Sequence, residues 1–112
     1  MRNLIKKLNI SLHNNINISI RTIGDKPGHV QSGQYLWPAS IDASNYIIDN
    51  WDLIKTDKVL ELGAGCGLTG LVISKLPHVT SVVFTDYDNG TLSLFKIVLI
   101  LMNVMHKLTC II

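Results

Sequence analysis

The sequence is poor in several residue types, and each shortage excludes a class of protein. Only two of its 112 residues are cysteines, too few for the disulfide framework that stabilises small secreted domains, and one of them sits inside a glycine-rich stretch, which favours a reducing compartment. The formal net charge is only +2, which does not indicate a nucleic-acid or acidic partner. Repeats and low-complexity linkers are absent. With 47% hydrophobic residues, the chain suits one small globular domain or part of a longer protein.

Acidic residues are missing from the first 24 positions, since the first is Asp25. A mitochondrial leader can have this character, but serine and arginine are scarce here, and no apolar signal-peptide core follows the basic start. We therefore expect a cytoplasmic or nuclear protein, with the mitochondrial leader as the alternative.

Two short segments near the amino terminus alternate apolar and polar residues, as half-buried strands do. The apolar members are Leu8, Ile10 and Leu12 in the first segment and Ile16, Ile18 and Ile20 in the second. Between them, Asn14-Asn15 suits the turn of a hairpin. The pattern predicts a small β extension over residues 1–35, packed beside the main sheet of a second domain over residues 36–112.

A polar stretch with Pro27, Gly28 and Gly33 predicts a loop over residues 25–34. Pro38 then suits the first turn of a helix, and the apolar residues that follow continue that helix to about Trp51. Just ahead of it stands Trp37, which is either a core aromatic or a wall of a cofactor pocket.

The most informative stretch is a strand-like segment that opens into alternating glycines. Lys58 to Leu62 is short and mostly apolar, which suits a buried parallel strand. Gly63, Gly65 and Gly67 let the backbone turn sharply and present bare amide groups to a ligand. Apolar periodicity from Leu68 to Leu76 predicts a helix directly after them. A strand, a glycine turn and a helix amino terminus are typical of a nucleotide site.

The spacing of the glycines excludes two common nucleotide motifs. Counted from Gly63, the sixth position of a dinucleotide fingerprint is Leu68 rather than glycine. A phosphate-binding Walker loop ends in Gly-Lys-Ser/Thr, and no lysine follows the glycines until Lys75. The pattern present is Glu-x-Gly-x-Gly-x-Gly, beginning at Glu61.

A second signal lies downstream. Val79 to Thr85 is rich in β-branched residues and predicts the next strand, and Asp86 follows it at once. Asp86 lies 19 residues beyond Gly67, close to the offset at which an acidic side chain accepts hydrogen bonds from both ribose hydroxyls. The glycines and this aspartate together predict a nucleoside site.

Each of these residues also has a plainer interpretation. The glycines could form a structural turn, and Asp86 could lie in a solvated loop. Glu61 could make a purely structural hydrogen bond instead of reaching the ligand, since a buried carboxylate needs a partner. Cys66 could be a nucleophile, although without a nearby histidine a small residue filling a tight turn is the favoured interpretation.

Taken together, these motifs resemble a known family. The glycine spacing resembles motif I of the class I methyltransferases that use S-adenosylmethionine (SAM). The segment Gly-x-x-x-Trp-Pro-Ala from Gly33, the run VLELGAGCGLTGL from Val59 and TDYD from Thr85 are similar to methyltransferase family 16, seven-strand enzymes that methylate lysines of proteins. The resemblance covers roughly residues 30–96.

The resemblance implies an α/β, Rossmann-like SAM methyltransferase fold, with SAM as cofactor and a protein lysine as methyl acceptor. The acceptor could instead be arginine, histidine or a small molecule. Neither a metal, a nucleic acid nor a membrane is implied, and the oligomeric state stays open. The residues implied to contact SAM, matched position by position, are Trp37, Glu61, Gly63, Gly65, Gly67, Asp86 and Tyr87, the last beside the adenine.

The sequence also departs from the family. Residues 92–105 predict a helix that is apolar almost all round, with a membrane role as the less favoured alternative, and residues 108–112 can at most begin a third strand. The family orders its strands 3-2-1-4-5-7-6, so only the N-terminal half of the sheet is expected here, with one edge of its first strand unpaired. The acidic-x-x-aromatic motif near the substrate lysine has no counterpart, and catalytic residues stay unknown. The alternative function is therefore a truncated, catalytically inactive SAM-binding half-domain.

Overall fold

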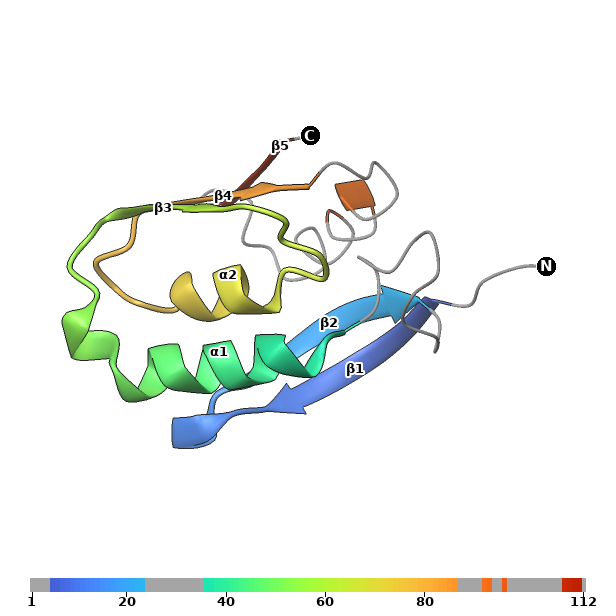
Figure 1. The fold of residues 1–112 in the computed structure, drawn as a ribbon, viewed down its shortest axis with the longest axis horizontal. Coiled ribbons are helices and arrows are strands. Elements are labelled where there is room, and N and C mark those ends of the chain that lie inside the picture. Colours follow the sequence, from blue (N-terminus) through green and yellow to red (C-terminus); the bar gives the residue numbers. More distant parts are fainter. Residues whose placement is uncertain (1–4, 24–35, 87–91, 94–95, 97–107, 112) are drawn as a thin grey trace.

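The computed structural model describes residues 5–23, 36–86, 92–93, 96 and 108–111. These residues form three layers (Figure 1): a β-hairpin, a layer of helices, and a parallel three-stranded sheet. The carboxyl ends of the sheet strands all point to the same end of the molecule, and this end carries the glycine loop.

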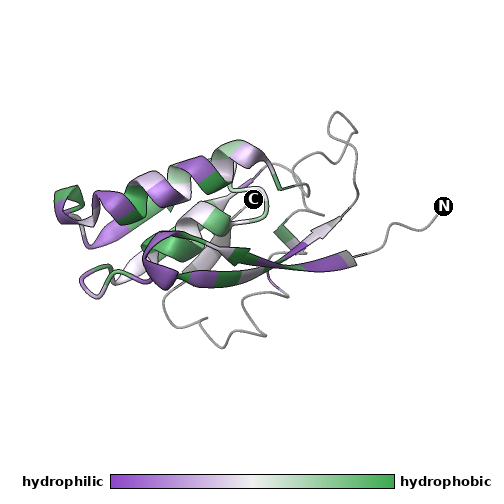
Figure 2. Cartoon of the chain, turned by 90° about the horizontal axis from the view of Figure 1, so that it is seen from below, coloured by the Kyte–Doolittle hydropathy of each residue, from purple (hydrophilic) through white to green (hydrophobic). Residues whose placement is uncertain are grey.

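The amino-terminal hairpin forms as its alternating residues predict. Strand β1 (Ile5–Ser11) pairs antiparallel with β2 (Asn17–Ile23), and the alternation of hydropathy along both strands is visible in Figure 2. A short 3-10 turn, η1 (His13–Asn15), connects them. Asn14 and Asn15 have φ angles of 55° and 58°, a left-handed conformation that asparagine tolerates better than most residues. The predicted turn is confirmed.

The hairpin was expected to pack beside the three-stranded sheet, and this expectation is wrong. The helices separate the hairpin from the sheet (Figure 1). Its turn is fastened to the first long helix. The backbone amide of His13 donates to Asn45 Oδ1 at 2.9 Å, and His13 Nδ1 lies 3.0 Å from both carboxylate oxygens of Asp49. The apolar face of β2 must be buried against another apolar surface. The helices present apolar side chains to it, whereas the edge of a sheet presents polar backbone groups.

Helix α1 (Pro38–Asp49) begins where the sequence predicts, with Pro38 in its first turn. Proline suits this position because its fixed φ is helical and its missing amide would have no partner there. The buried side of α1 carries Ser44 and Ile48, and a 3-10 turn, η3 (Trp51–Leu53), follows.

The parallel sheet contains β3 (Lys58–Glu61), β4 (Ser81–Thr85) and β5 (Leu108–Ile111), in the order β3-β4-β5. Helix α2 (Leu68–Ile73) follows the glycine loop and covers one sheet face. It is shorter than the predicted helix, although single-turn hydrogen bonds continue the chain to Leu76. This order matches the 3-2-1 half expected from the family, so the N-terminal half of a Rossmann-like fold is confirmed.

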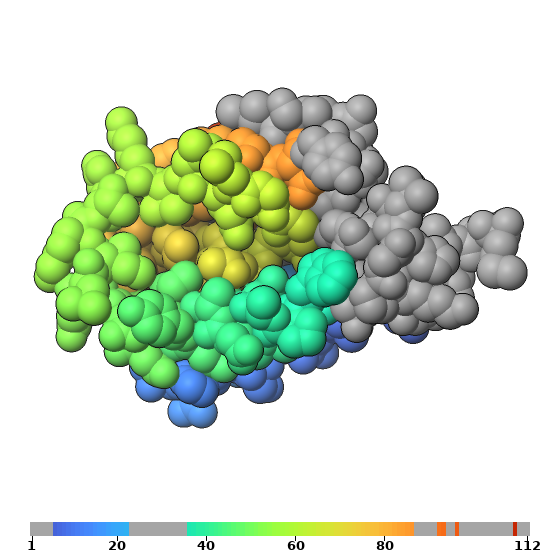
Figure 3. Space-filling view, in the orientation of Figure 1, coloured from blue at the N-terminus to red at the C-terminus, as the bar shows by residue number. Residues whose placement is uncertain are grey.

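One apolar core joins the three layers. In the space-filling view, α2 shows only between α1 and the β3 segment (Figure 3), in keeping with its almost complete burial. The core side chains come from the hairpin, both helices and the sheet, and include Ile18, Ile20, Ile48, Leu68, Leu71, Val72, Val82 and Phe84.

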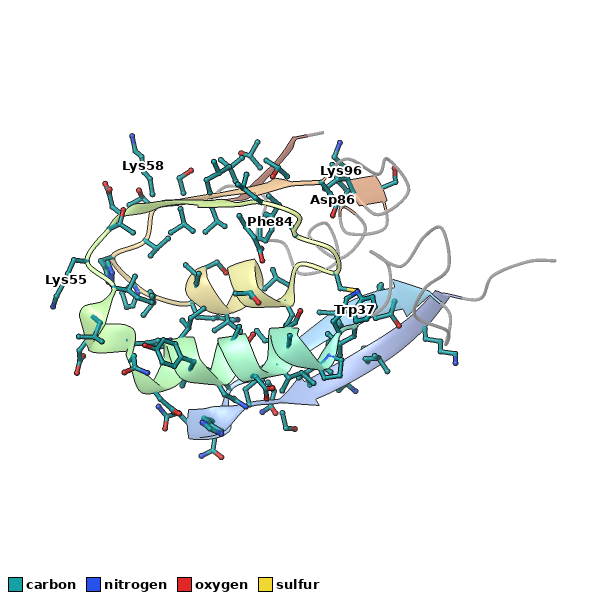
Figure 4. The ribbon with its side chains drawn as sticks, viewed as in Figure 1. Trp37, Lys55, Lys58, Phe84, Asp86 and Lys96 are labelled. Carbon is teal, nitrogen blue, oxygen red and sulfur yellow. The ribbon has the colours of Figure 1, made fainter. Side chains whose placement is uncertain are left out.

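The opposite face of the sheet is uncovered among the described residues. Lys58 points away from α2 while Phe84 points toward it (Figure 4). On the outward face of β3 and just beyond it, Leu60 and Leu62 are 60% and 76% exposed. Within the described ranges, β3 is also an edge strand. A parallel sheet usually has both faces covered, so the described residues leave this face and this edge uncovered.

Two sequence expectations lie wholly or mostly outside the described residues: the loop at 25–34 and the apolar helix at 92–105. Of the latter, Leu92, Ser93 and Lys96 are described as helical, and Leu92 is buried. Across the described part of the chain, the helices all fall short of the length and apolarity needed to span a bilayer.

Candidate functional site

The glycine loop between β3 and α2 adopts the conformation that its spacing predicts. Gly63, Gly65 and Gly67 have φ angles of 63°, 57° and 80°, in the left-handed region where a side chain is strained. Gly67 is also the residue that immediately precedes α2. The alternation of glycines is thus a backbone requirement, because every second residue of the loop is left-handed.

Hydrogen bonds fix this loop to the end of the neighbouring strand. The Ala64 amide donates to the Thr85 carbonyl at 2.8 Å, and the Gly65 amide donates to Asp86 Oδ2 at 3.0 Å. Gly67 closes the turn by donating to the Ala64 carbonyl at 2.9 Å. The two predicted parts of the nucleoside site, the loop and the acidic strand end, are therefore in direct contact.

Space for a ligand remains at the first glycine. A Cβ added to Gly63 would meet no heavy atom within 4 Å. Gly63 is therefore required by its φ angle and not by crowding, and its backbone faces open space that a ligand can enter. This is the exposed part of the loop, whereas Gly67 is buried.

Glu61, the last residue of β3, lies on the inner face of the sheet under α2. Burial raises the pKa of its carboxyl from 4.5 to about 7, while a backbone hydrogen bond from Gly70 opposes the rise. Its Oε1 atom is buried and has no hydrogen-bond partner among the described residues. Burial in this setting favours the protonated carboxyl, and an unsatisfied buried oxygen is costly unless a donor reaches it.

Gly70 is a residue of this site that the sequence did not single out. A Cβ at this position would overlap the ring of Phe84 and would lie 2.7 Å from Glu61 Oε1. Helix α2 can therefore approach the sheet this closely only because position 70 carries no side chain. A glycine inside a helix was the available signal, since glycine weakens helices and needs a packing reason there.

The sequence pattern also did not indicate that Thr85 belongs to this site. Its hydroxyl donates to the Glu61 carbonyl at 2.8 Å while its own carbonyl accepts the Ala64 amide. This residue thus ties the ends of both strands to the loop. A threonine in a β-branched strand looks like any other strand former, so nothing in the pattern distinguished it.

Cys66 lies within the loop but is only 8% exposed. Burial raises the pKa of its thiol to about 12. Because the thiolate is the nucleophilic form, this residue is unsuited to attack a substrate, and the interpretation as a small residue filling a tight turn is favoured.

Trp37 and Asp86 both lie toward the end of the molecule where β3 and β4 terminate (Figure 4). Trp37 is the residue directly before α1. It is 42% exposed, so it is not a core aromatic. Asp86 is 9% exposed, which argues against a solvated loop position. Tyr87 lies outside the described residues.

A hollow of about 350 Å³ occupies a different part of the surface. It is lined by Trp51, Asp52, Ile54, Lys55 and His78. Lys55 and His78 precede β3 and β4, so this hollow lies at the amino ends of the strands, away from the glycine loop. Ligands of open parallel sheets bind at the carboxyl ends, and the hollow is therefore not the nucleoside site.

The fold and the loop define a class: a Rossmann-like α/β unit with a glycine loop at the carboxyl ends of its strands, the end at which ligands of this fold bind. A family model described as lysine methyltransferase matches residues 14–108. This match covers most of the sequence, and the chain belongs to the lysine methyltransferase family. The resemblance inferred from the Trp-Pro segment, the glycines and the strand-end aspartate is confirmed, and SAM is the cofactor of this family.

Several curated relatives carry methyltransferase names. The Schizosaccharomyces pombe protein N-terminal and lysine N-methyltransferase efm7 is 41% identical over 75 residues, which are 67% of this chain and 28% of the relative. The human protein-lysine N-methyltransferase EEF2KMT is 36% identical over 54% of this chain and 18% of its own length. The Dictyostelium discoideum histidine protein methyltransferase 1 homolog is 39% identical over 55% of this chain and 19% of its own. The chain thus spans less than a third of the length of these relatives.

Proposed function

We propose that this chain forms the SAM-binding part of a protein-lysine N-methyltransferase. The observation that carries the proposal is the contact between the glycine loop and the end of β4, where the Gly65 amide meets the Asp86 carboxylate. A loop of left-handed glycines facing a strand-end carboxylate suits a nucleoside whose ribose hydroxyls donate to that carboxylate. Bound there, SAM would supply an electrophilic methyl group on a sulfonium.

The described residues fit this cofactor in chemistry as well as position. The open space at Gly63 lets a ligand approach bare backbone. Asp86 provides acceptor oxygens for hydroxyl groups. No donor among the described residues reaches the buried Oε1 of Glu61, and a cationic group such as the amino group of the cofactor would favour the ionised form of this carboxyl. Trp37 is exposed enough to form a wall of the same site.

The acceptor that we propose is a lysine side chain of a protein. The names of the efm7 relative and of EEF2KMT include lysine methylation, which supports this acceptor over the alternatives. A histidine acceptor, as in the name of the Dictyostelium relative, is the runner-up. A lysine amine has a pKa near 10.4 in water, so the site must deprotonate and orient it. None of the described residues is assigned to that step.

A second candidate function is that of a SAM-binding unit without transferase activity. The uncovered face of the sheet and the edge position of β3 among the described residues favour it. Open α/β sheets bind ligands in a crevice with walls from strands on both sides, and the described strands supply one side.

Calorimetry of the purified chain with SAM tests the binding that both candidates share. We expect binding by the parent chain, and affinity at least about tenfold weaker in Asp86→Ala, because hydrogen bonds to charged groups contribute about 1.5–3 kcal/mol. Asp42→Ala, which removes an exposed carboxylate on α1, is the matched control and should bind like the parent. Absence of heat from parent and control alike would refute the binding proposal.

A radiolabelled methyl-transfer assay on cell extract then separates the two candidates. Labelling of protein bands that withstands acid, and that disappears with Asp86→Ala, would support the enzyme. Binding without labelling would support the second candidate.

A further inference from the structure

The contact between Asp86 and the loop has a geometry that a ligand-binding role alone does not explain. In the β3–β4 ladder, Glu61 is opposite Phe84, and the next bond toward the loop runs from the Ala64 amide to the Thr85 carbonyl. Beyond it, the Gly65 amide finds the side chain of Asp86 instead of a backbone carbonyl. The carboxylate thus adds a side-chain acceptor for the loop directly beside the last main-chain bond between the loop and β4.

This bond lies in a protected environment. Asp86 is 9% exposed, and Gly65 is half-buried. A hydrogen bond from an amide to a charged acceptor is stronger than a neutral one, and low local polarity strengthens it further. The same burial makes loss of the acceptor costly for the Gly65 amide, which would then lack a partner.

The loop needs such a restraint because of its composition. Glycine loses more conformational freedom on folding than any other residue. Three of the five residues from 63 to 67 are glycines in the left-handed region. Without a fixed acceptor, this segment would sample many backbone shapes, and a ligand would have to order it on binding.

We propose that Asp86 is a positioning residue for the glycine loop: its carboxylate, by accepting the Gly65 amide, holds the loop in the ligand-ready shape before any ligand binds. This role rests on the proposed function, since it concerns the same site, but the loop shape can be measured without ligand. Asp86 then acts on cofactor affinity in two ways, through its own contact with the ribose and through the pre-ordered loop.

Amide hydrogen exchange by NMR on the ligand-free chain tests the positioning role. In Asp86→Ala we expect the Gly65 amide to exchange at least about tenfold faster, while Val82 and Phe84 in β4 keep their rates. In Asp86→Asn, whose side-chain carbonyl can still accept, Gly65 should stay within about threefold of the parent. Equal protection of Gly65 in the parent and the alanine variant would overturn the proposal, as would its loss in the asparagine variant.

Should the alanine variant unfold, a second measurement on the parent decides the matter. A scalar coupling across the hydrogen bond, between the Gly65 amide nitrogen and the Asp86 carboxyl carbon, is expected, and its absence in a well-resolved spectrum would overturn the inference. SAM titrations of the same samples separate the two proposals. Both variants should bind more weakly than the parent, and alanine more weakly than asparagine. If the Gly65 amide of the parent exchanges slowly but the parent does not bind SAM, the proposed function is refuted while the positioning role of Asp86 is supported.

Discussion

Glu61 makes the stability of the fold depend on pH in an unusual direction. Its folded pKa, raised by burial from 4.5 to about 7, means that the folded chain holds a proton which the unfolded chain releases between these values. Folding therefore binds a proton in this window, and the free energy of unfolding falls as pH rises. Below pH 4.5 the ionisation of Glu61 does not lower the free energy of unfolding, and above pH 7 the full cost of burying its carboxylate is present.

The size of the effect follows from the shift. At about 1.4 kcal/mol per pKa unit, the rise to about 7 corresponds to roughly 3 kcal/mol. This is a large part of the 5–15 kcal/mol or so by which small domains are stable. The chain should consequently be markedly more stable at pH 5 than at pH 8, whereas most proteins lose stability on acidification.

Urea denaturation at pH 5, 6, 7 and 8 measures this slope, with Glu61→Gln as the matched variant. Glutamine has nearly the same shape and does not titrate, so the parent should lose roughly 2.5 kcal/mol more than the variant between pH 5 and pH 8. All other ionisable groups are common to both proteins, so their contributions cancel in the difference. Parallel pH profiles for parent and variant would refute the account of Glu61.

Four further predictions concern two glycines, the thiol and the uncovered face. Gly70→Ala should lower the free energy of unfolding by about 1–3 kcal/mol through overpacking, and Gly63→Ala by about 1–2 kcal/mol through its φ angle alone; urea denaturation with a cofactor titration checks both. Cys66, in a background whose other cysteine is serine, should react with a disulfide reagent at pH 8 more than about 100-fold slower than in the unfolded chain; equal rates would contradict its burial. Replacing Leu60 and Leu62 together by glutamine should reduce self-association in light scattering while changing stability by less than about 1 kcal/mol.

The sequence predicted those parts of the fold that depend on local backbone chemistry. Alternation of apolar residues and the paired asparagines were enough for the hairpin, because the side-chain period of a strand and the left-handed tolerance of asparagine are local properties. The glycine loop was predictable for the same reason: positive φ angles at alternate positions require residues without Cβ. Pro38 likewise marked the start of α1.

The sequence did not predict how the elements pack against one another. The hairpin was expected beside the main sheet, but its position on the helix layer depends on which apolar surfaces remain uncovered, and periodicity does not encode that. The close approach of Gly70 to Phe84 joins residues from different elements. The bond from Gly65 to Asp86 was missed in the same way: the spacing put both at one ligand, and only coordinates show that they also hold each other.

Binding and methyl transfer place different demands on the site, and the described residues answer only the first. Holding a nucleoside requires bare loop backbone and a carboxylate acceptor, and in the proposed function β3, the loop and β4 supply these. Transfer to lysine requires in addition that an amine with a pKa near 10.4 lose its proton in a water-poor pocket, which needs groups on the other side of the crevice. Leu60 and Leu62 lie on the outward side of β3, where apolar side chains remain in water. Among the described residues the second wall would have to be added at the edge of β3, next to this exposed face. A polypeptide that pairs with that edge and covers the two leucines should therefore also raise the stability of the unit.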